Sequence, residues 1–152
     1  MKLRNYFFWV RNFIINGERS AAIGFSARAV GSARAAMMVC RNVVSEEGGL
    51  DAPDYRKLRF AELWTKLSSM EASLENTAMN GNRQDALAAK IFTSQTLQTL
   101  LVDAVQFQGG FGYTDPHQNL ARHYRDALAF VLIDTPNDAL LSRIAKTILS
   151  DQ

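Results

Sequence analysis

Residues 82–107, NRQDALAAKIFTSQTLQTLLVDAVQF, decide the fold class of this chain. Apolar residues recur in this stretch at spacings of three and four, as one face of a helix requires. A helix that is apolar over most of its girth is buried by several neighbours. The segment therefore predicts the central helix of an all-α domain. Its apolar positions are Leu87, Ile91, Leu97, Leu100, Leu101, Ala104, Val105 and Phe107.

Two further long helices are predicted on the N-terminal side of this segment. Residues 18–44 carry an apolar stripe made mostly of small side chains, so that another helix can approach closely. Residues 53–79 repeat larger apolar side chains at the same spacings. Gly48-Gly49 and Asn80-Gly81-Asn82 break the pattern. The two stripes are Ala22, Phe25, Ala29, Ala33, Ala36, Cys40 and Val43, then Phe60, Leu63, Leu67, Met70, Leu74 and Thr77.

The C-terminal part predicts a helix from residue 117 to about residue 132 and a last helix over residues 136–149. Thr135 is expected to be the N-cap of the last helix and Pro136 its first residue. Long helices, short polar connections and no alternating Val/Ile/Thr runs predict an antiparallel (up-down) four-helix bundle over residues 17–152.

Residues 1–16 form a separate apolar N-terminal arm, in which Tyr6, Phe7, Phe8 and Trp9 are consecutive. We expect an extra helix there, buried against the bundle or in an interface between subunits. The alternative is a helix at a membrane surface, with Lys2, Arg4 and Arg11 on its polar side.

Composition excludes several classes of function. The chain has 17 Lys+Arg against 15 Asp+Glu, a net charge of +2, and no basic run of five or more residues, which argues against nucleic-acid binding. The single Cys40 excludes an internal disulfide framework, and two histidines argue against a metal enzyme. Residues 21–44 are long enough to span a bilayer, but three arginines argue against a membrane span. We expect a cytoplasmic location.

Two short motifs narrow the interpretation. Residues 103–113 read DAVQFQGGFGY, and residues 124–127 read YRDA. Together they resemble the C-terminal helical domain of the acyl-CoA dehydrogenase family, in which a Gln-x-x-Gly-Gly-x-Gly-Tyr/Phe element closes a long helix and an Arg-Asp-Ala element follows. The resemblance covers residues 17–149 and is sharpest from Asp103 to Ala127.

The resemblance implies that Gln106, Gly109, Gly110 and Gly112 contact the FAD of a neighbouring subunit. It therefore also implies a homodimer or homotetramer. Glycine lets the backbone approach a ligand closely, and bare N–H groups in such a turn suit a pyrophosphate. The alternative is that Gly109 and Gly110 only terminate the preceding helix.

The resemblance further implies α,β-dehydrogenation of an acyl-CoA thioester, with a carboxylate that removes the α-proton while the flavin accepts a hydride. Many family members carry this base as a glutamate in a Glu-Gly-Thr triplet, nine residues beyond the arginine of Arg-Asp-Ala. Here that position is Asp134, one methylene shorter, and Thr135-Pro136 follows. The alternative role of Asp134 is to support the N-terminus of the last helix.

Two departures from the family pattern limit the expected activity. Residues 45–49, SEEGG, replace an Arg-x-x-Phe-Gly element that touches FAD in many members. The family's N-terminal helical domain and middle β-domain have no counterpart in this chain. We expect the chain alone to be inactive, as a fragment, a truncated gene product or a split subunit whose missing domains a separately encoded partner supplies. The alternatives are a non-enzymatic oligomerisation or partner-binding module and a related flavin-dependent monooxygenase.

Overall fold

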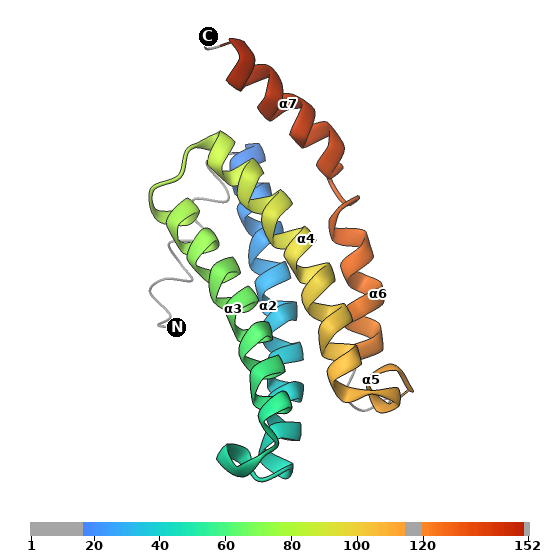
Figure 1. Cartoon of the computed structure of the whole chain (residues 1–152). Helices are drawn as coiled ribbons and strands as arrows, with labels where there is room; N and C mark the ends of the chain where they lie inside the picture. The colour runs from blue at the N-terminus through green and yellow to red at the C-terminus, as the bar shows by residue number, and fades with distance from the viewer. Residues whose placement is uncertain (1–16, 115–119, 151–152) are drawn as a thin grey trace.

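The computed structural model describes residues 17–114 and 120–150, so the predicted N-terminal arm lies outside the described residues. The described residues form α2 (Gly17–Glu46), a short 3₁₀ helix η1 (Gly49–Asp51), α3 (Asp54–Met79), α4 (Arg83–Gln108), α5 (Gly110–Thr114), α6 (Leu120–Phe130) and α7 (Asn137–Ser150) (Figure 1). These ranges contain helices and no strand, which confirms the all-α prediction. No helix within them has an apolar stretch long enough to cross a bilayer.

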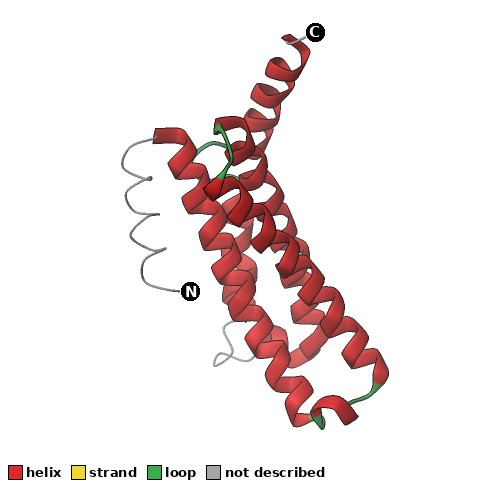
Figure 2. Ribbon diagram, turned by 90° about the vertical axis from the view of Figure 1, so that its left-hand side faces the viewer, coloured by secondary structure: helices red, strands yellow, loops and turns green. Residues whose placement is uncertain are grey.

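Helix α4 is the centre of the fold. It contacts α2, α3, α6 and α7, and Figure 1 shows α2, α3 and α6 running beside it. Leu97, Leu100, Leu101 and Ala104 are completely buried, as the apolar pattern of residues 82–107 predicts. The fourth helix of the bundle is therefore α6, which packs beside α4. Helix α7 extends beyond the bundle (Figure 2).

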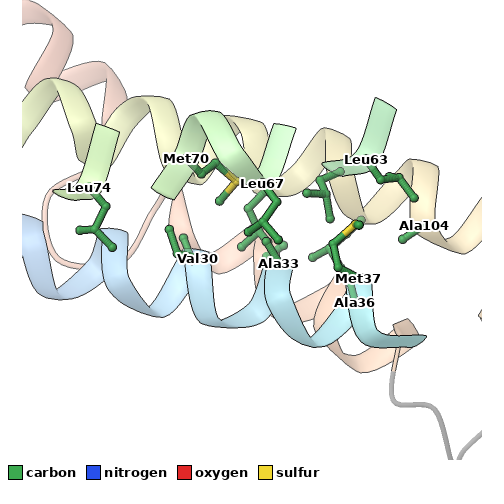
Figure 3. Packing of buried hydrophobic residues seen from close by; sticks show 14 of the residues in the cluster. Val30, Ala33, Ala36, Met37, Leu63, Leu67, Met70, Leu74 and Ala104 are labelled. Carbon is green, nitrogen blue, oxygen red and sulfur yellow. The ribbon is translucent and has the colours of Figure 1, made fainter. Parts of the chain in front are cut away.

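The face of α2 toward the core consists of small residues. Ala29, Ala33 and Ala36 have no exposed surface, and Cys40 follows them on the same stripe. Figure 3 shows Val30, Ala33, Ala36 and Met37 of α2 opposite the larger labelled side chains of α3. Small side chains allow the helix backbones to approach, and the leucines and methionines of α3 then fill the remaining space. Those α3 side chains are Leu63, Leu67, Met70 and Leu74.

Polar side chains close the end of the bundle where α3 meets α4. Asn82 forms a capping box with Asp85, which satisfies free N–H groups at the start of α4. The Arg19 guanidinium donates to the carbonyl oxygens of Gly81 (3.0 Å) and Thr77 (3.2 Å), at the last turn of α3. Glu18 accepts hydrogen bonds from Arg83 and Arg143, which joins α2 to α4 and α7.

Three details of the structure differ from the prediction. Helix α7 begins at Asn137, so Pro136 precedes the helix, and its carbonyl accepts the Leu140 N–H at 3.1 Å. Thr135 therefore lies one residue before the N-cap position, and its carbonyl oxygen accepts a hydrogen bond from Lys90. The glycine-rich segment after α4 folds into the short helix α5 rather than an open turn.

Cys40 provides a test of the core. Burial raises the pKa of its thiol to about 12, and the Arg56 guanidinium opposes this rise by a smaller amount. At pH 8 only about one thiol in ten thousand is then ionised in the folded protein. We expect a disulfide reagent such as DTNB to label native Cys40 slowly and to label the urea-unfolded chain rapidly. Labelling of the native protein at the rate measured in urea would contradict this packing.

Candidate functional site

The glycine-rich segment is folded tightly at the end of α4. Gly109 has φ +65°, a conformation that favours glycine, and its N–H donates to the Gln106 carbonyl oxygen at 3.0 Å. The Gly112 N–H donates to the Gly109 carbonyl oxygen at 3.1 Å. These two N–H groups form hydrogen bonds within the segment, so they are not among the free N–H groups that were predicted for a ligand.

Gly109, Gly110 and Gly112 differ in the space around them. A Cβ atom at Gly112 would lie 2.7 Å from the Val105 carbonyl oxygen and 2.7 Å from Gln108 Cβ, so this glycine permits α5 to pack on α4. A Cβ at Gly109 or Gly110 would meet nothing within 4 Å. The backbone of Gly109 and Gly110 is therefore open to an approaching group, while Gly112 is buried inside the turn.

The Gln106 side chain is exposed and lines a cavity of about 290 Å³ between α3 and α4. One side of the cavity comes from the first turns of α3, and the other comes from the last turns of α4. The cavity combines an amide, aromatic rings, two guanidinium groups and two carboxylates. Its lining residues are Tyr55, Arg56, Arg59, Glu62, Leu63, Asp103, Gln106 and Phe107.

Arg56 fixes the inner side of this cavity. Its guanidinium donates to the Phe107 carbonyl oxygen, lies 4.9 Å from the centroid of the Phe107 ring, and its Nε lies 3.1 Å from a Glu47 carboxylate oxygen. These contacts hold the start of α3 against the end of α4. The sequence interpretation missed Arg56. Arg56 lies in the first turn of α3, where a positive charge opposes the helix dipole. An arginine at such a position indicates that another contact compensates for it, and this could have identified Arg56 from the sequence.

Asp134 lies in the connection between α6 and α7, where it is exposed and has φ +65°. Aspartate and asparagine tolerate this left-handed conformation better than most side chains. The backbone conformation therefore explains an aspartate at position 134 without any catalytic role.

Asp134 and the glycine-rich segment lie near different parts of α4. The residues beside Asp134 contact Lys90, whereas Gly109 follows the end of α4. The rise of 1.5 Å per helical residue separates Lys90 from Gly109 by about 28 Å. The structure thus does not bring Asp134 together with Gln106, Gly109, Gly110 and Gly112 within one chain.

A buried polar network holds the Asp134 connection against α4. Lys90 is only 2% exposed, and its Nζ donates to the Thr135 carbonyl oxygen at 2.9 Å and to Asn137 Oδ1 at 2.8 Å. Asn137 Nδ2 in turn donates to Ser94 Oγ at 2.9 Å. Burial lowers the pKa of Lys90, and the negative charge of Asp134 partly offsets this effect. The sequence interpretation missed this network, because Lys90 interrupts an apolar face that otherwise continues to Leu97 and Leu101.

The Arg-Asp-Ala element is divided between solvent and core. Arg125 and Asp126 are exposed, and the Asp126 carboxylate pairs with Arg122 at 3.6 Å. Ala127 is completely buried. Within residues 17–114 and 120–150, no group of three or more His, Cys, Asp and Glu residues is arranged to hold a metal ion.

A family model described as "Acyl-CoA dehydrogenase, C-terminal domain" matches residues 13–149. This chain belongs to the acyl-CoA dehydrogenase family. The resemblance stated from the two motifs is thereby confirmed.

Known relatives show how much of a family member this chain represents. It is 27% identical over 144 residues to a 3-sulfinopropanoyl-CoA desulfinase of Advenella mimigardefordensis, a match that covers 90% of this chain and 36% of that protein. It is 26% identical over 136 residues to a 3-(aryl)acrylate reductase of Clostridium sporogenes, covering 84% of this chain and 36% of that protein. The chain therefore spans about a third of the length of these relatives.

The fold also matches that of a solved structure. A structure described as the electron transferring flavoprotein of Acidaminococcus fermentans superposes with a TM-score of 0.76 at 24% identity, over 86% of this chain and 37% of that chain. At this identity the likeness supports the fold alone.

Two glycine variants test whether Gly112 is tightly packed while Gly110 is open to solvent. Gly112→Ala should destabilise the protein by about 1–3 kcal/mol, because the new methyl group meets the α4 backbone. Gly110→Ala should change the free energy of unfolding by less than about 0.5 kcal/mol, because its methyl group meets open space. Urea unfolding followed by circular dichroism measures both, and equal losses would contradict the geometry.

Lys90→Met should destabilise the protein by about 1–3 kcal/mol, because Asn137 Oδ1 and the Thr135 carbonyl lose a buried donor. The folded-state pKa of Lys90 is lowered, so between that pKa and 10.5 the unfolded chain binds more protons than the folded chain. The free energy of unfolding of the wild type should therefore increase as pH rises toward 10.5.

The Lys90→Met variant should lack this alkaline gain, as measured by urea unfolding between pH 7 and pH 10.5. The exposed Lys146, changed to Met, is the control and should retain the wild-type dependence. An identical pH dependence in wild type and Lys90→Met would argue against a buried ammonium group.

Proposed function

We propose that this chain is the C-terminal helical domain of an FAD-dependent oxidoreductase that acts on acyl-CoA thioesters by α,β-dehydrogenation. The observation that supports this most directly is the exposed Gln106 amide next to the open backbone of Gly109 and Gly110, in a chain that belongs to the acyl-CoA dehydrogenase family. Gln106, Gly109 and Gly110 would contact the flavin of a neighbouring subunit. Gly112 would support them by allowing α5 to fold back on α4.

The described residues fit one wall of an FAD site. The side-chain amide of Gln106 offers both a donor and an acceptor, and no Cβ blocks the approach to Gly109 and Gly110. Bound FAD would supply the redox chemistry, and this chain would supply position and polarity. The chain spans about a third of its relatives, and we propose that N-terminal and middle domains of the family type supply the other walls, either from the same longer protein or from a partner subunit.

We propose Asp134 as the base, provided that another domain buries its carboxylate. It is exposed, so none of the described residues encloses its carboxylate. A carboxylate accepts a carbon-bound proton effectively only when burial raises its pKa toward the working pH. Partner domains that cover the connection between α6 and α7 would provide that burial. The Lys90 network holds the neighbouring backbone in place while this surface is covered.

Exposed apolar side chains on α6 and on the connection after it support association with other subunits. Large apolar side chains left open to solvent in one region mark interaction surfaces. We propose a homodimer or homotetramer, and the same observation favours the second candidate function, an oligomerisation module without catalysis. These side chains are Leu128, Leu132 and Ile133.

The isolated chain should not dehydrogenate acyl-CoA. It should show no turnover with FAD, a panel of saturated acyl-CoA thioesters and an artificial electron acceptor, because Asp134 stays solvated. Addition of a separately expressed fragment with the N-terminal and middle domains of a relative should produce turnover. Asp134→Asn should then lower the rate at least about a hundredfold, the contribution of a general base.

Asn is the matched replacement, since it also tolerates the positive φ at this position. Turnover by the isolated chain would contradict the requirement for a partner. Full activity of Asp134→Asn in the reconstituted sample would remove Asp134 from the chemistry. A stable oligomer that neither binds flavin nor responds to the added fragment would favour the oligomerisation module.

A further inference from the structure

We propose that Lys90, Ser94 and Asn137 are positioning residues for Asp134, because they hold residues 131–137 as a closed loop that fixes this aspartate before any other domain covers it. This rests on the proposed function, in which Asp134 is the base, and deepens it by naming the side chains that act through Asp134. The three residues lie outside both sequence motifs, residues 103–113 and residues 124–127.

Backbone hydrogen bonds close the loop at its base. The Asn137 N–H donates to the Val131 carbonyl oxygen at 2.9 Å, which joins the start of α7 to the end of α6. The Ile133 N–H donates to the Ala129 carbonyl oxygen at 2.8 Å, so the chain just before Asp134 is bound to the last turn of α6. Asp134 lies between these two contacts with φ +65°. Both ends of the loop are therefore fixed by this chain's own backbone.

The Asn137 side chain attaches the closed loop to α4. It is buried, its Nδ2 donates to Ser94 Oγ at 2.9 Å, and its Oδ1 accepts from Lys90 Nζ at 2.8 Å. Ser94 Oγ donates its own proton to the Ile91 carbonyl oxygen at 3.0 Å, which leaves its lone pairs for Asn137. Lys90 and Ser94 are four residues apart, so they lie on the same face of α4. Both the oxygen and the nitrogen of the Asn137 amide therefore have a partner on one helix face.

Lys90 holds the loop on the C-terminal side of Asp134. Its Nζ donates to the Thr135 carbonyl oxygen at 2.9 Å as well as to Asn137, so the loop is bound at residue 135 and at residue 137. The negative charge of Asp134 acts on the same ammonium group, since it partly offsets the fall in the Lys90 pKa that burial causes. The Lys90 ammonium group is therefore close to the residue that it positions.

Directional contacts distinguish this network from a simple attachment of α7. Apolar contacts, such as those of the buried Leu140, hold α7 on the bundle without fixing an orientation and without the cost of burying an ammonium group. A fully satisfied buried polar network specifies one geometry. A general base needs such a geometry, because a misplacement of about 1 Å can lower the rate about a hundredfold.

NMR relaxation of ¹⁵N in the isolated chain measures whether the loop is fixed without partner domains. In the wild type, the Asp134 amide should have an order parameter of about 0.85, the value of rigid backbone. Asn137→Ala should lower it below about 0.6, and Ser94→Ala should lower it in the same direction. Thr93→Val is the matched control and should keep the wild-type value, since Thr93 is a buried hydroxyl on α4 that donates to carbonyl oxygens of its own helix.

A double-mutant cycle in the reconstituted sample tests whether the network acts through Asp134. Asn137→Ala should lower kcat about 10–100-fold, Ser94→Ala should lower it by a smaller factor, and Thr93→Val should retain it. A positioning residue loses its effect when the group that it positions is removed, so Asn137→Ala should change the rate of Asp134→Asn by less than about twofold. A loss of folded protein would instead lower the rate equally in both backgrounds. Circular dichroism checks the folding of each variant, and Ser94→Ala replaces Asn137→Ala in the cycle if the latter is unfolded.

The proposal is overturned by an Asp134 order parameter below about 0.6 in the wild type, or by equal rate losses in the two backgrounds of the cycle. The proposed function has its own readout, the turnover of the wild-type reconstituted sample. Turnover that Asp134→Asn lowers and that Asn137→Ala and Ser94→Ala leave unchanged refutes the positioning role alone. Absence of turnover refutes the proposed function and with it the catalytic role of the loop, while the NMR measurement still decides whether the loop is fixed.

Discussion

The close approach of α2 to α4 determines the position of the other elements. Completely buried alanines line this face of α2, and an alanine-lined helix can approach its neighbour more closely than a leucine-lined one. The larger side chains of α3 then fill the groove that the pair leaves, and α6 covers the remaining side of α4. A larger residue at Ala29, Ala33 or Ala36 would separate α2 from α4 and would also move the ends of α3 and α4 that form the cavity.

The helices could be predicted from the sequence because each has a continuous stripe of apolar residues at helical spacing. The stripe of residues 53–79, from Leu63 to Thr77, is buried as predicted. Helix α5 was missed because three of the six residues from Gly109 to Thr114 are glycines, which have low helix propensity. It forms because Gly112 fits against the backbone of Val105, a contact that depends on tertiary packing.

The candidate site could be predicted only in part. The motif identified Gln106 and the glycines, but most of the residues that share a cavity with Gln106 come from α3, 43–51 residues earlier in the chain. Their proximity depends on how α3 and α4 are aligned, and no local pattern contains this information. Lys90 was missed for a related reason. A single lysine in a helix is normally solvated, and its burial depends on acceptors at Thr135 and Asn137.

The attachment of α7 has a consequence for cooperativity. Asn137 and Leu140 are the buried residues of this helix, and both are in its first turn. The remaining turns project past the bundle and share little of its core (Figure 2). Helix α7 should therefore open as a local unit, at a lower free energy than global unfolding of α2, α3 and α4. Its amide hydrogens beyond the first turn would exchange with solvent while those of the central helix stay protected, and the boundary between the two parts falls one turn after the connection that carries Asp134.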